Sequence, residues 1–533
     1  MEVDVLGNVK KQTFLQGALI IAIAHIFVKI IGALFKIPLT RFILGPDGIG
    51  IYNSSYTIYN VLFIVSTAGL PVAISKMVSE SIAKKNYNEA LKIFNVSRII
   101  LFVLGALGFC VLLFGATAFA EFLKIPSAGI AIMSMAPSLF FVSLMSSYRG
   151  FYQGMSNMMP TAISEVIESF GKMFVGLALA YIFLSYGVEY AASGAILGVS
   201  TGTFIAAAFL MLYWKKLQPD VKKMCTQDAK TSSSKSIASK LVKLAIPITL
   251  GASVFTLASV IDLTMIMRQL ADLGFDEDAR KTMYGYYSGY AVTMFNLPPT
   301  IIASLAVSIV PAISSALVNR DAVTATKTVE TAIRITFLIA LPCAIGMSVL
   351  SGPILNLAFG DTGAELLLAI LAYGVIFVSV VMVANAIIQA KGNVWVPVIN
   401  MCIGGIVKVV VNYILVGNIN ININGAPVGT VLCYLTTAVL DIVAINKYFT
   451  PKYGVSFFVK TIISAIIMGV CAKYLYSGLV SVTSSNNISL LVSVVCAVLI
   501  YFGLIIVFKA VERQDLEAMP FGEKLVKLLN NFL

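Results

Sequence analysis

Long apolar runs recur along the whole chain, and they constrain its fold more than any other feature. One membrane crossing needs about 20 apolar residues, because the hydrocarbon core is about 30 Å thick and a helix rises about 1.5 Å per residue. The run from Leu101 to Ala120 contains no charged residue. Similar runs fill most of the 533 residues. The sequence therefore predicts an all-helical protein that crosses the membrane many times.

Composition excludes most other classes. Only 12% of the residues are charged and 59% are hydrophobic, whereas a soluble chain carries about 25% charged residues. This rules out a soluble enzyme, a disordered chain and a nucleic-acid binder, despite the net charge of +12. His25 is the one histidine, the cysteines lack metal-ligand spacing, and no nucleotide-binding or HExxH motif occurs. We expect no enzymatic activity, metal or cofactor, so a membrane potential or an ion gradient would supply the energy.

Polar breaks separate fourteen predicted transmembrane helices. They cover residues 13–43, 50–83, 90–118, 127–154, 159–185, 190–216, 240–271, 283–318, 323–351, 363–391, 396–417, 426–448, 456–476 and 487–510. An even number of crossings places both termini on one side. The outer connections contain only Lys124, Arg280 and Lys281 as basic residues, and the termini and inner connections contain many more. The positive-inside rule then predicts that both termini are cytosolic.

The two halves of the chain show a weak internal repeat. An offset of 236 residues pairs four identities: Arg98 with Arg334, Gln153 with Gln389, Asn157 with Asn393 and Lys172 with Lys408. At an offset of 231, Gly194 and Gly198 match Gly425 and Gly429. We therefore predict two parallel six-helix repeats, related by an axis along the membrane normal, with two extra helices.

The repeat divides the chain into five predicted parts. These are an N-lobe (1–217), a flexible cytosolic linker (218–239), a C-lobe (240–450), helices 13 and 14 (451–512) and a C-terminal segment (513–533). In the last part, Phe521, Leu525, Leu528, Leu529 and Phe532 recur at helical spacing. This pattern predicts an amphipathic helix on the inner leaflet, more often a surface anchor than a regulatory element.

Ionisable residues inside the predicted helices are costly and need a reason. Six basic residues are candidate substrate ligands: Lys29, Lys36, Arg41, Lys172, Arg268 and Lys408. A site rich in such cations suits an anionic substrate, with phosphates as the leading group. Two alternatives without substrate binding stay open. Glu165 or Glu168 neutralises Lys172 as a buried ion pair, and Arg41 and Arg268 are interfacial anchors. Arg149 and Asp441 lie nearer cytosolic helix ends, where snorkelling or loop pairing explains them.

Asp262 is the leading candidate for coupling to an ion or a proton. It is a carboxylate within the apolar stretch around Val260, and such a group can bind Na⁺ or take up a proton. A salt bridge to Lys408 is an equally good interpretation. Asn412, one turn beyond Lys408, can join either arrangement.

Several segments resemble a known family. They run from Phe27 to Gly32, from Pro46 to Tyr52 and from Ala68 to Lys76, with Arg149 to Gly154 and Pro160. They are similar to the polysaccharide-biosynthesis branch of the multidrug/oligosaccharidyl-lipid/polysaccharide exporter superfamily. Within it, the chain resembles stage V sporulation protein B-like proteins and MurJ-type lipid II flippases.

The resemblance implies a V-shaped, two-lobed transporter in the bacterial plasma membrane that flips undecaprenyl-linked sugar precursors outward by alternating access. It implies a cationic central cavity for the pyrophosphate and a groove for the lipid tail beside the two extra helices. Lys29 and Lys36 fall near the family's basic positions in helix 1. Its basic residue early in helix 8 is absent, since Ala291 to Phe295 occupies that region, and Arg268 or Lys408 would replace it. Asp262 matches one acid of the family's sodium site; helix 11 offers Lys408 and Asn412 instead.

Four functions are compared. A lipid II flippase leads, with membrane lipids and cell-wall synthesis proteins as further partners. A flippase for another lipid-linked glycan, such as a capsule or teichoic acid unit, comes second. An ion-coupled multidrug exporter comes third, because such exporters usually stop at twelve helices and cationic drugs favour carboxylates. A membrane glycosyltransferase is weakest, since the largest outer loop, residues 272–283, is short and lacks histidine.

Overall fold

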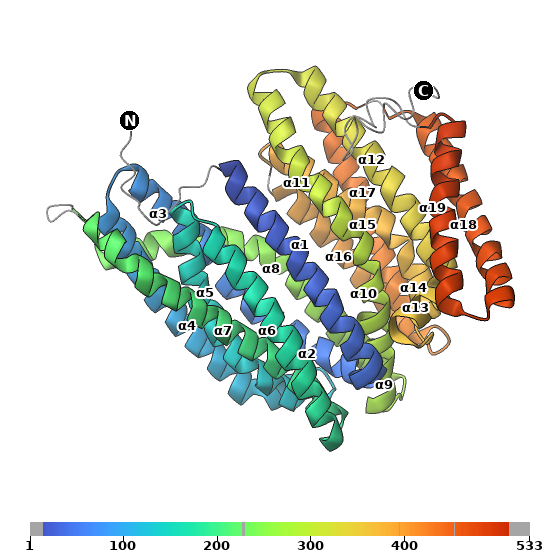
Figure 1. Cartoon of the computed structure of the whole chain (residues 1–533), viewed down its shortest axis with the longest axis horizontal. Helices are drawn as coiled ribbons and strands as arrows, with labels where there is room; N and C mark the ends of the chain where they lie inside the picture. The colour runs from blue at the N-terminus through green and yellow to red at the C-terminus, as the bar shows by residue number, and fades with distance from the viewer. Residues whose placement is uncertain (1–13, 226–229, 394, 452, 511–533) are drawn as a thin grey trace. The chain divides into compact units, whose positions relative to one another are not determined.

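The computed structural model describes residues 14–225, 230–393, 395–451 and 453–510, and this part of the chain is helical without a strand. It forms two compact units. Residues 14–271 and 276–285 belong to the first unit, and residues 272–275 and 286–510 belong to the second. Figure 1 shows the helices of both units in chain order.

The first unit consists of long helices joined by short turns. Its elements are α1 (Phe14–Pro38), the π-helix η1 (Leu39–Leu44), α2 (Gly45–Thr67), α3 (Gly69–Ala83), α4 (Tyr87–Phe122), η2 (Pro126–Ala128), α5 (Gly129–Gly154), α6 (Met159–Phe183), η3 (Leu184–Tyr186), α7 (Val188–Lys223), α8 (Ser234–Asp272) and α9 (Glu277–Tyr284).

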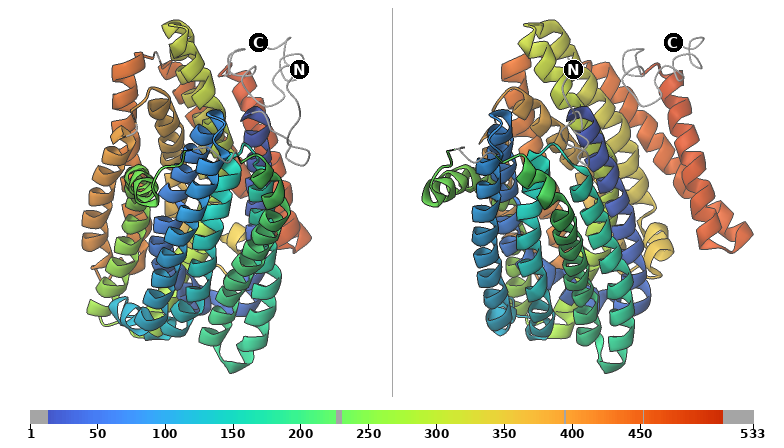
Figure 2. Two further views of the ribbon diagram at one scale, coloured as in Figure 1. Left: turned by 90° about the vertical axis from the view of Figure 1, so that its left-hand side faces the viewer. Right: turned by 60° about the vertical axis from the view of Figure 1, so that its left-hand side comes forward.

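The second unit contains more broken helices. After the π-helix η4 (Gly285–Ala291), its elements are α10 (Val292–Phe295), α11 (Leu297–Val318), α12 (Ala322–Val349), α13 (Ser351–Phe359), α14 (Glu365–Ala372), α15 (Gly374–Ala390), α16 (Trp395–Val416), η5 (Asn422–Asn424), α17 (Gly425–Phe449), α18 (Val455–Thr483) and α19 (Asn486–Val507). The last two helices pack on each other, and they are the red pair in Figure 2.

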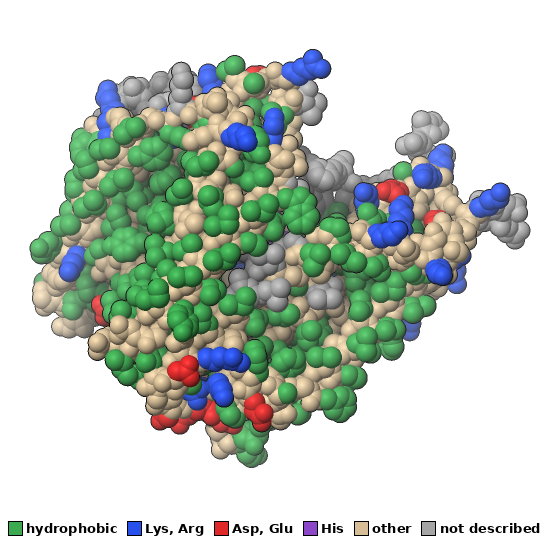
Figure 3. Space-filling model, turned by 180° about the vertical axis from the view of Figure 1, so that it is seen from behind, with side chains coloured by type: hydrophobic (Ala, Val, Ile, Leu, Met, Phe, Trp, Pro, Cys, Tyr) green, Lys and Arg blue, Asp and Glu red, His purple; other side chains and the backbone are tan. Residues whose placement is uncertain are grey.

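The prediction of a multi-pass helical membrane protein is confirmed. Among the described residues, ten helical stretches are long and apolar enough to cross a membrane, or eleven if α14 and α15, bent by 42°, form one span. On the face drawn in Figure 3, hydrophobic side chains cover the middle of the helices, and Lys, Arg, Asp and Glu gather mainly near the helix ends. This distribution suits contact with lipid along the helices and with water at their ends.

Each predicted helix corresponds to helical structure, and the structure adds detail to the predicted division of the chain. Both ends of the predicted linker 218–239 are helical, because α7 continues to Lys223 and α8 starts at Ser234. By contacts, α8 belongs with the first unit and not with the residues that follow it. The predicted amphipathic helix lies outside the described residues.

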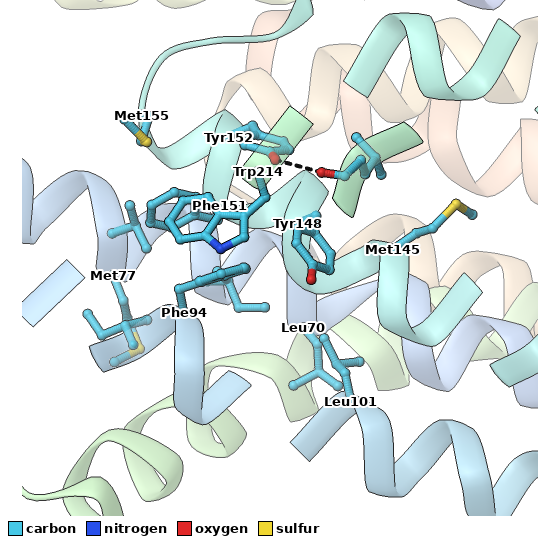
Figure 4. Close-up of a cluster of buried hydrophobic side chains, with 14 of the residues drawn as sticks. Leu70, Met77, Phe94, Leu101, Met145, Tyr148, Phe151, Tyr152, Met155 and Trp214 are labelled. Atoms are coloured by element: carbon cyan, nitrogen blue, oxygen red, sulfur yellow. Dashed lines mark hydrogen bonds between the residues drawn. The ribbon is translucent and has the colours of Figure 1, made fainter. Parts of the chain in front are cut away.

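A cluster of large buried side chains fixes α3, α4, α5 and α7 against one another (Figure 4). Phe94 is at its centre, with ring centroids 4.7 Å from both Phe151 and Trp214. The Tyr152 hydroxyl donates to the carbonyl oxygen of Leu210 at 3.0 Å, so its polar group is satisfied inside the cluster. This packing makes the first unit a stable support for the helices that carry charged residues.

Glycines bring α6 and α7 unusually close. Gly194, Gly198 and Gly202 recur every four residues on α7, the spacing by which small residues let membrane helices approach. A Cβ atom on Gly198 would overlap the backbone of Gly176, and one on Gly202 would lie 2.8 Å from the amide nitrogen of Lys172. The close approach therefore fixes the position of Lys172 along the first unit.

We predict that Gly198→Ala lowers the stability of the protein by about 1–3 kcal/mol, because the added methyl group forces α6 and α7 apart. The measurement is the midpoint of thermal unfolding of the purified protein in detergent. The control is Gly478→Ala on α18, where a Cβ atom meets nothing within 4 Å and alanine favours the helix. Equal midpoints for the two variants would contradict close packing at Gly198.

Candidate functional site

Lys172 is the central cation of the first unit. It lies half-buried on α6, and its Nζ atom is 5.0 Å from the ring centroid of Phe35 on α1 and 5.0 Å from that of Tyr56 on α2. Among the described side chains, no carboxylate lies within 4.0 Å of this ammonium group. Aromatic faces attract a cation without neutralising it. The charge of Lys172 is therefore held in place but remains available to an anion.

A column of aromatic rings on α2 supports this arrangement. Tyr52, Tyr56, Tyr59 and Phe63 follow one another with centroid separations of 5.8, 5.6 and 5.4 Å. Tyr52 also contacts Phe35, at 6.2 Å between centroids. Rings three or four residues apart lie on one face of a helix, so each ring limits the rotation of the next. The column holds Tyr56 against Lys172.

Lys36 adds a second cation to the same place. It is in the last turn of α1, and it is close enough to Lys172 for the two ammonium groups to repel each other. Two like charges near each other in a poorly solvated region are unfavourable unless an anion joins them. Lys36 and Lys172 are thus two predicted substrate ligands whose charges act on each other.

The alternative in which Glu168 forms an ion pair with Lys172 is not what the structure shows. Glu168 accepts from the guanidinium Nη2 of Arg149 on α5 at 2.9 Å, and Arg149 Nε also donates to the Ser164 hydroxyl at 3.0 Å. The side chains of Arg149 and Glu168 are 17% and 25% exposed. Arg149 is thus a partly buried partner within the unit, and not the snorkelling residue that the sequence suggested.

Glu165 pairs with a residue that the sequence analysis set aside. His25 Nε2 on α1 is 3.2 Å from Glu165 Oε2. Lys29, one turn further along α1, is exposed and lies close enough to His25 to influence it electrostatically. The members of this set come from α1, α5 and α6. We call His25, Lys29, Lys36, Arg149, Glu165, Glu168 and Lys172 the cationic face, because four fixed cations outnumber two carboxylates.

The remaining basic candidates of the first unit lie against aromatic rings. Arg268 on α8 is exposed, with its guanidinium carbon 4.8 Å from the Phe122 ring centroid. Arg41 in η1 is also exposed, and its guanidinium lies over the ring of its neighbour Phe42 at 5.2 Å. Both contacts suit the interpretation as interfacial anchors, which the sequence left open.

Three further predicted residues, Asp262, Lys408 and Asn412, are not among the residues of the cationic face. Asp262 is half-buried on α8 of the first unit, and Lys408 and Asn412 are on α16 of the second unit. Asn412 is fully buried, and its amide oxygen fills the space that a Cβ atom on Gly429 of α17 would need. Their role in substrate binding or ion coupling stays a prediction.

Asp441 is the acidic residue that the sequence misplaced. A position eight residues before the end of α17 suggested pairing in water near a loop, but the side chain is fully buried against α16. Asn400 donates to its Oδ1 atom at 2.8 Å. The position of Asp441 along its helix could not show this burial, because burial depends on which face of α17 meets α16.

Tyr52 and Tyr56 were not predicted from the sequence as part of the site, and Arg149 was given another explanation. One signal was available for the tyrosines, since Tyr52, Tyr56 and Tyr59 recur at spacings of four and three on one helix. A polar-tipped aromatic stripe in a membrane helix often lies against a charge or a cavity. For Arg149 no local signal existed, since its partner Glu168 belongs to a different helix.

We predict that Arg149 and Glu168 are energetically coupled by about 0.5–3 kcal/mol. Arg149→Ala leaves Glu168 without its countercharge. The loss of stability in the double variant should therefore be smaller than the sum of the losses in the two single variants. The measurement is a double-mutant cycle on the midpoint of thermal unfolding. Lys223 and Asp220 form the control pair, since they are 77% and 33% exposed and should couple weakly. Additive effects at Arg149 and Glu168 would contradict the pairing.

Comparison with known proteins places this geometry in a family. The model of the polysaccharide biosynthesis protein family matches residues 14–317, more than half of the chain. Stage V sporulation protein B of Bacillus subtilis (strain 168) is 26% identical over 523 residues, which are 97% of this chain and 99% of that protein. Lipid II flippase MurJ of the same organism is 24% identical over 481 residues, covering 86% and 88%.

Solved structures show the same fold. Lipid II flippase MurJ in an inward closed conformation superposes with a TM-score of 0.67 at 14% identity, covering 92% of this chain and 98% of that chain. An inward-facing multidrug resistance MATE family transporter of the MOP superfamily gives 0.65 at 14% identity, covering 81% and 98%. The fold is therefore shared with both kinds of transporter. The chain belongs to the polysaccharide biosynthesis protein family.

Proposed function

We propose that this protein flips a polyprenyl-pyrophosphate-linked glycan across the bacterial plasma membrane, with lipid II as the leading substrate. The cationic face is the observation that carries the proposal. Lys172 and Lys36 are held close together among aromatic rings, with the nearest acidic groups paired to other partners. A pyrophosphate has the charge and the oxygen acceptors that two neighbouring ammonium groups require.

The repeat predicted from sequence gains support from packing inside each unit. Gly198 of α7 abuts Gly176 of α6 in the first unit, and Gly429 of α17 abuts Asn412 of α16 in the second. The offsets 236 and 231 convert the first contact into the second. Equivalent contacts at both offsets favour two repeated helix bundles, as alternating access by a two-lobed transporter requires.

The proposed topology keeps fourteen crossings with both termini in the cytosol. The ten stretches that pass the length test include Ile23–Ala83, which has 61 residues. As one straight helix it would extend about 90 Å, roughly three times the hydrocarbon thickness. Its backbone turns at Gly45, where φ is +59°, so two crossings fit better than one.

Two other substrates remain as alternatives. A flippase for another lipid-linked glycan would use the same cationic face, because the pyrophosphate is common to such lipids. A multidrug exporter shares the fold, as the MATE structure shows. Cationic drugs, however, would be repelled by a face with four fixed cations and two paired carboxylates. The charge balance therefore favours an anionic lipid.

We predict that the intact protein rescues bacterial cells depleted of their own lipid II flippase and that Lys172→Met abolishes the rescue. Loss of the ammonium group removes the strongest contact to the pyrophosphate, while methionine still packs between Phe35 and Tyr56. Lys29→Ala should also lose rescue. Colony formation and the amount of protein in the membrane are the measurements.

Lys216→Met is the matched control, because Lys216 is exposed on α7 outside the cationic face. It should rescue as well as the unchanged protein. Full rescue by Lys172→Met would remove that residue from the substrate site. Failure of the unchanged protein, expressed at normal level, would exclude lipid II and leave another lipid-linked glycan.

A further inference from the structure

A polar stripe runs along the contact between α16 and α17 in the second unit. Its members recur every four residues on each helix, so each set shares one face. On the two antiparallel helices the members are Asn400, Gly404, Lys408 and Asn412, and Asp441, Thr437, Cys433 and Gly429. Gly404 lies against the Thr437 hydroxyl and the Cys433 carbonyl oxygen, and Gly429 lies against Asn412. The two helices are therefore in close contact along the stripe.

Asp441 is the acidic group of this stripe. Its side chain is fully buried, and Asn400 Nδ2 donates to Oδ1 at 2.8 Å. The second oxygen, Oδ2, is buried without a hydrogen-bond partner. About one turn before Asp441 on α17, Ala438 packs with Val380 and Val381 of α15. One oxygen of the carboxyl is thus bonded, and the other is buried without a bond.

No countercharge reaches this carboxyl among the described residues. Other charged and titratable groups lie on α17 itself and on three of the helices that pack against it, and α15 has none. They are Lys408, Cys402 and Tyr413 on α16, Lys327, Glu330, Arg334 and Cys343 on α12, Glu365 on α14, and Cys433, Tyr434, Lys447 and Tyr448 on α17. None forms an ion pair with Asp441. Arg334 instead lies over the Phe457 ring, 4.6 Å from its centroid.

An ionised carboxylate is unstable in such a place, because it needs several donors or a cation and has one amide donor. Protonation removes the charge and leaves only a neutral hydroxyl. We propose that Asp441 is a proton-binding site, with its carboxyl protonated while α16 and α17 are in contact. Oδ2 takes up a proton from hydronium in the solvent: one O–H bond of hydronium breaks, a new O–H bond forms at Oδ2, and a neutral water molecule remains. Release of that proton places a charge in the stripe and favours its hydration, so proton occupancy biases the packing of α16 on α17.

The proposal does not depend on the transported substrate, and its test needs none. Infrared difference spectroscopy of the purified full-length protein in lipid nanodiscs detects the carbonyl stretch of a protonated carboxyl group. We expect this band at neutral pH in the unchanged protein and its loss in Asp441→Asn, which keeps the shape and the bond from Asn400. Asp220→Asn is the control, because Asp220 is on the solvent-facing end of α7, paired with Lys223. It should keep the band.

A second variant keeps the test valid if Asp441→Asn misfolds. Asn400→Ala keeps the carboxyl but removes its donor, so the band should persist at a shifted frequency. Replacement of choline by sodium at constant ionic strength should leave the band unchanged. A band that is absent from the unchanged protein at neutral pH, or that survives in folded Asp441→Asn, would overturn the proposal. Loss of the band on adding sodium would overturn it in favour of a sodium site.

Discussion

The candidate site depends on one constraint: the ammonium charge of Lys172 has to be stabilised inside an apolar helix bundle without a carboxylate that neutralises it. Lys172 meets this constraint through the faces of Phe35 and Tyr56 and not through a carboxylate. Cation–π contacts stabilise an ammonium group without cancelling its charge, as a carboxylate would. The ring column on α2 and the glycine contact between α6 and α7 both serve to hold this one side chain in position.

The acidic residues nearby reinforce the same arrangement. Glu168 is bonded to Arg149, and Glu165 is paired with His25, so neither takes Lys172 as its ion-pair partner. In the second unit, the buried ionisable residue has a different environment. At the α16–α17 contact, Asp441 has an amide donor on one oxygen and nothing on the other. A fixed cation in one unit and a protonatable acid in the other would give an anion transporter both a binding group and a means of responding to a proton gradient.

Much of the fold follows from the sequence because apolar runs and polar breaks are local signals. Each predicted helix corresponds to helical structure, and the family resemblance is confirmed. The breaks within helices were less visible. The bend between α14 and α15 falls at Tyr373, without a proline to mark it. The helical ends of the linker were missed because Lys and Ser residues are typical of flexible segments, although α8 starts at Ser234 and packs on the first unit.

The candidate site was less predictable, since partners are chosen between helices. The cations were identifiable from their cost in the membrane, but the pairing of Glu168 with Arg149 and the burial of Asp441 depend on helix rotation and contact. The most direct test of the account is the affinity of the purified protein in nanodiscs for undecaprenyl pyrophosphate, compared with uncharged undecaprenol. The account predicts at least about tenfold tighter binding of the pyrophosphate, weakened by salt. Equal binding of the two lipids would contradict it.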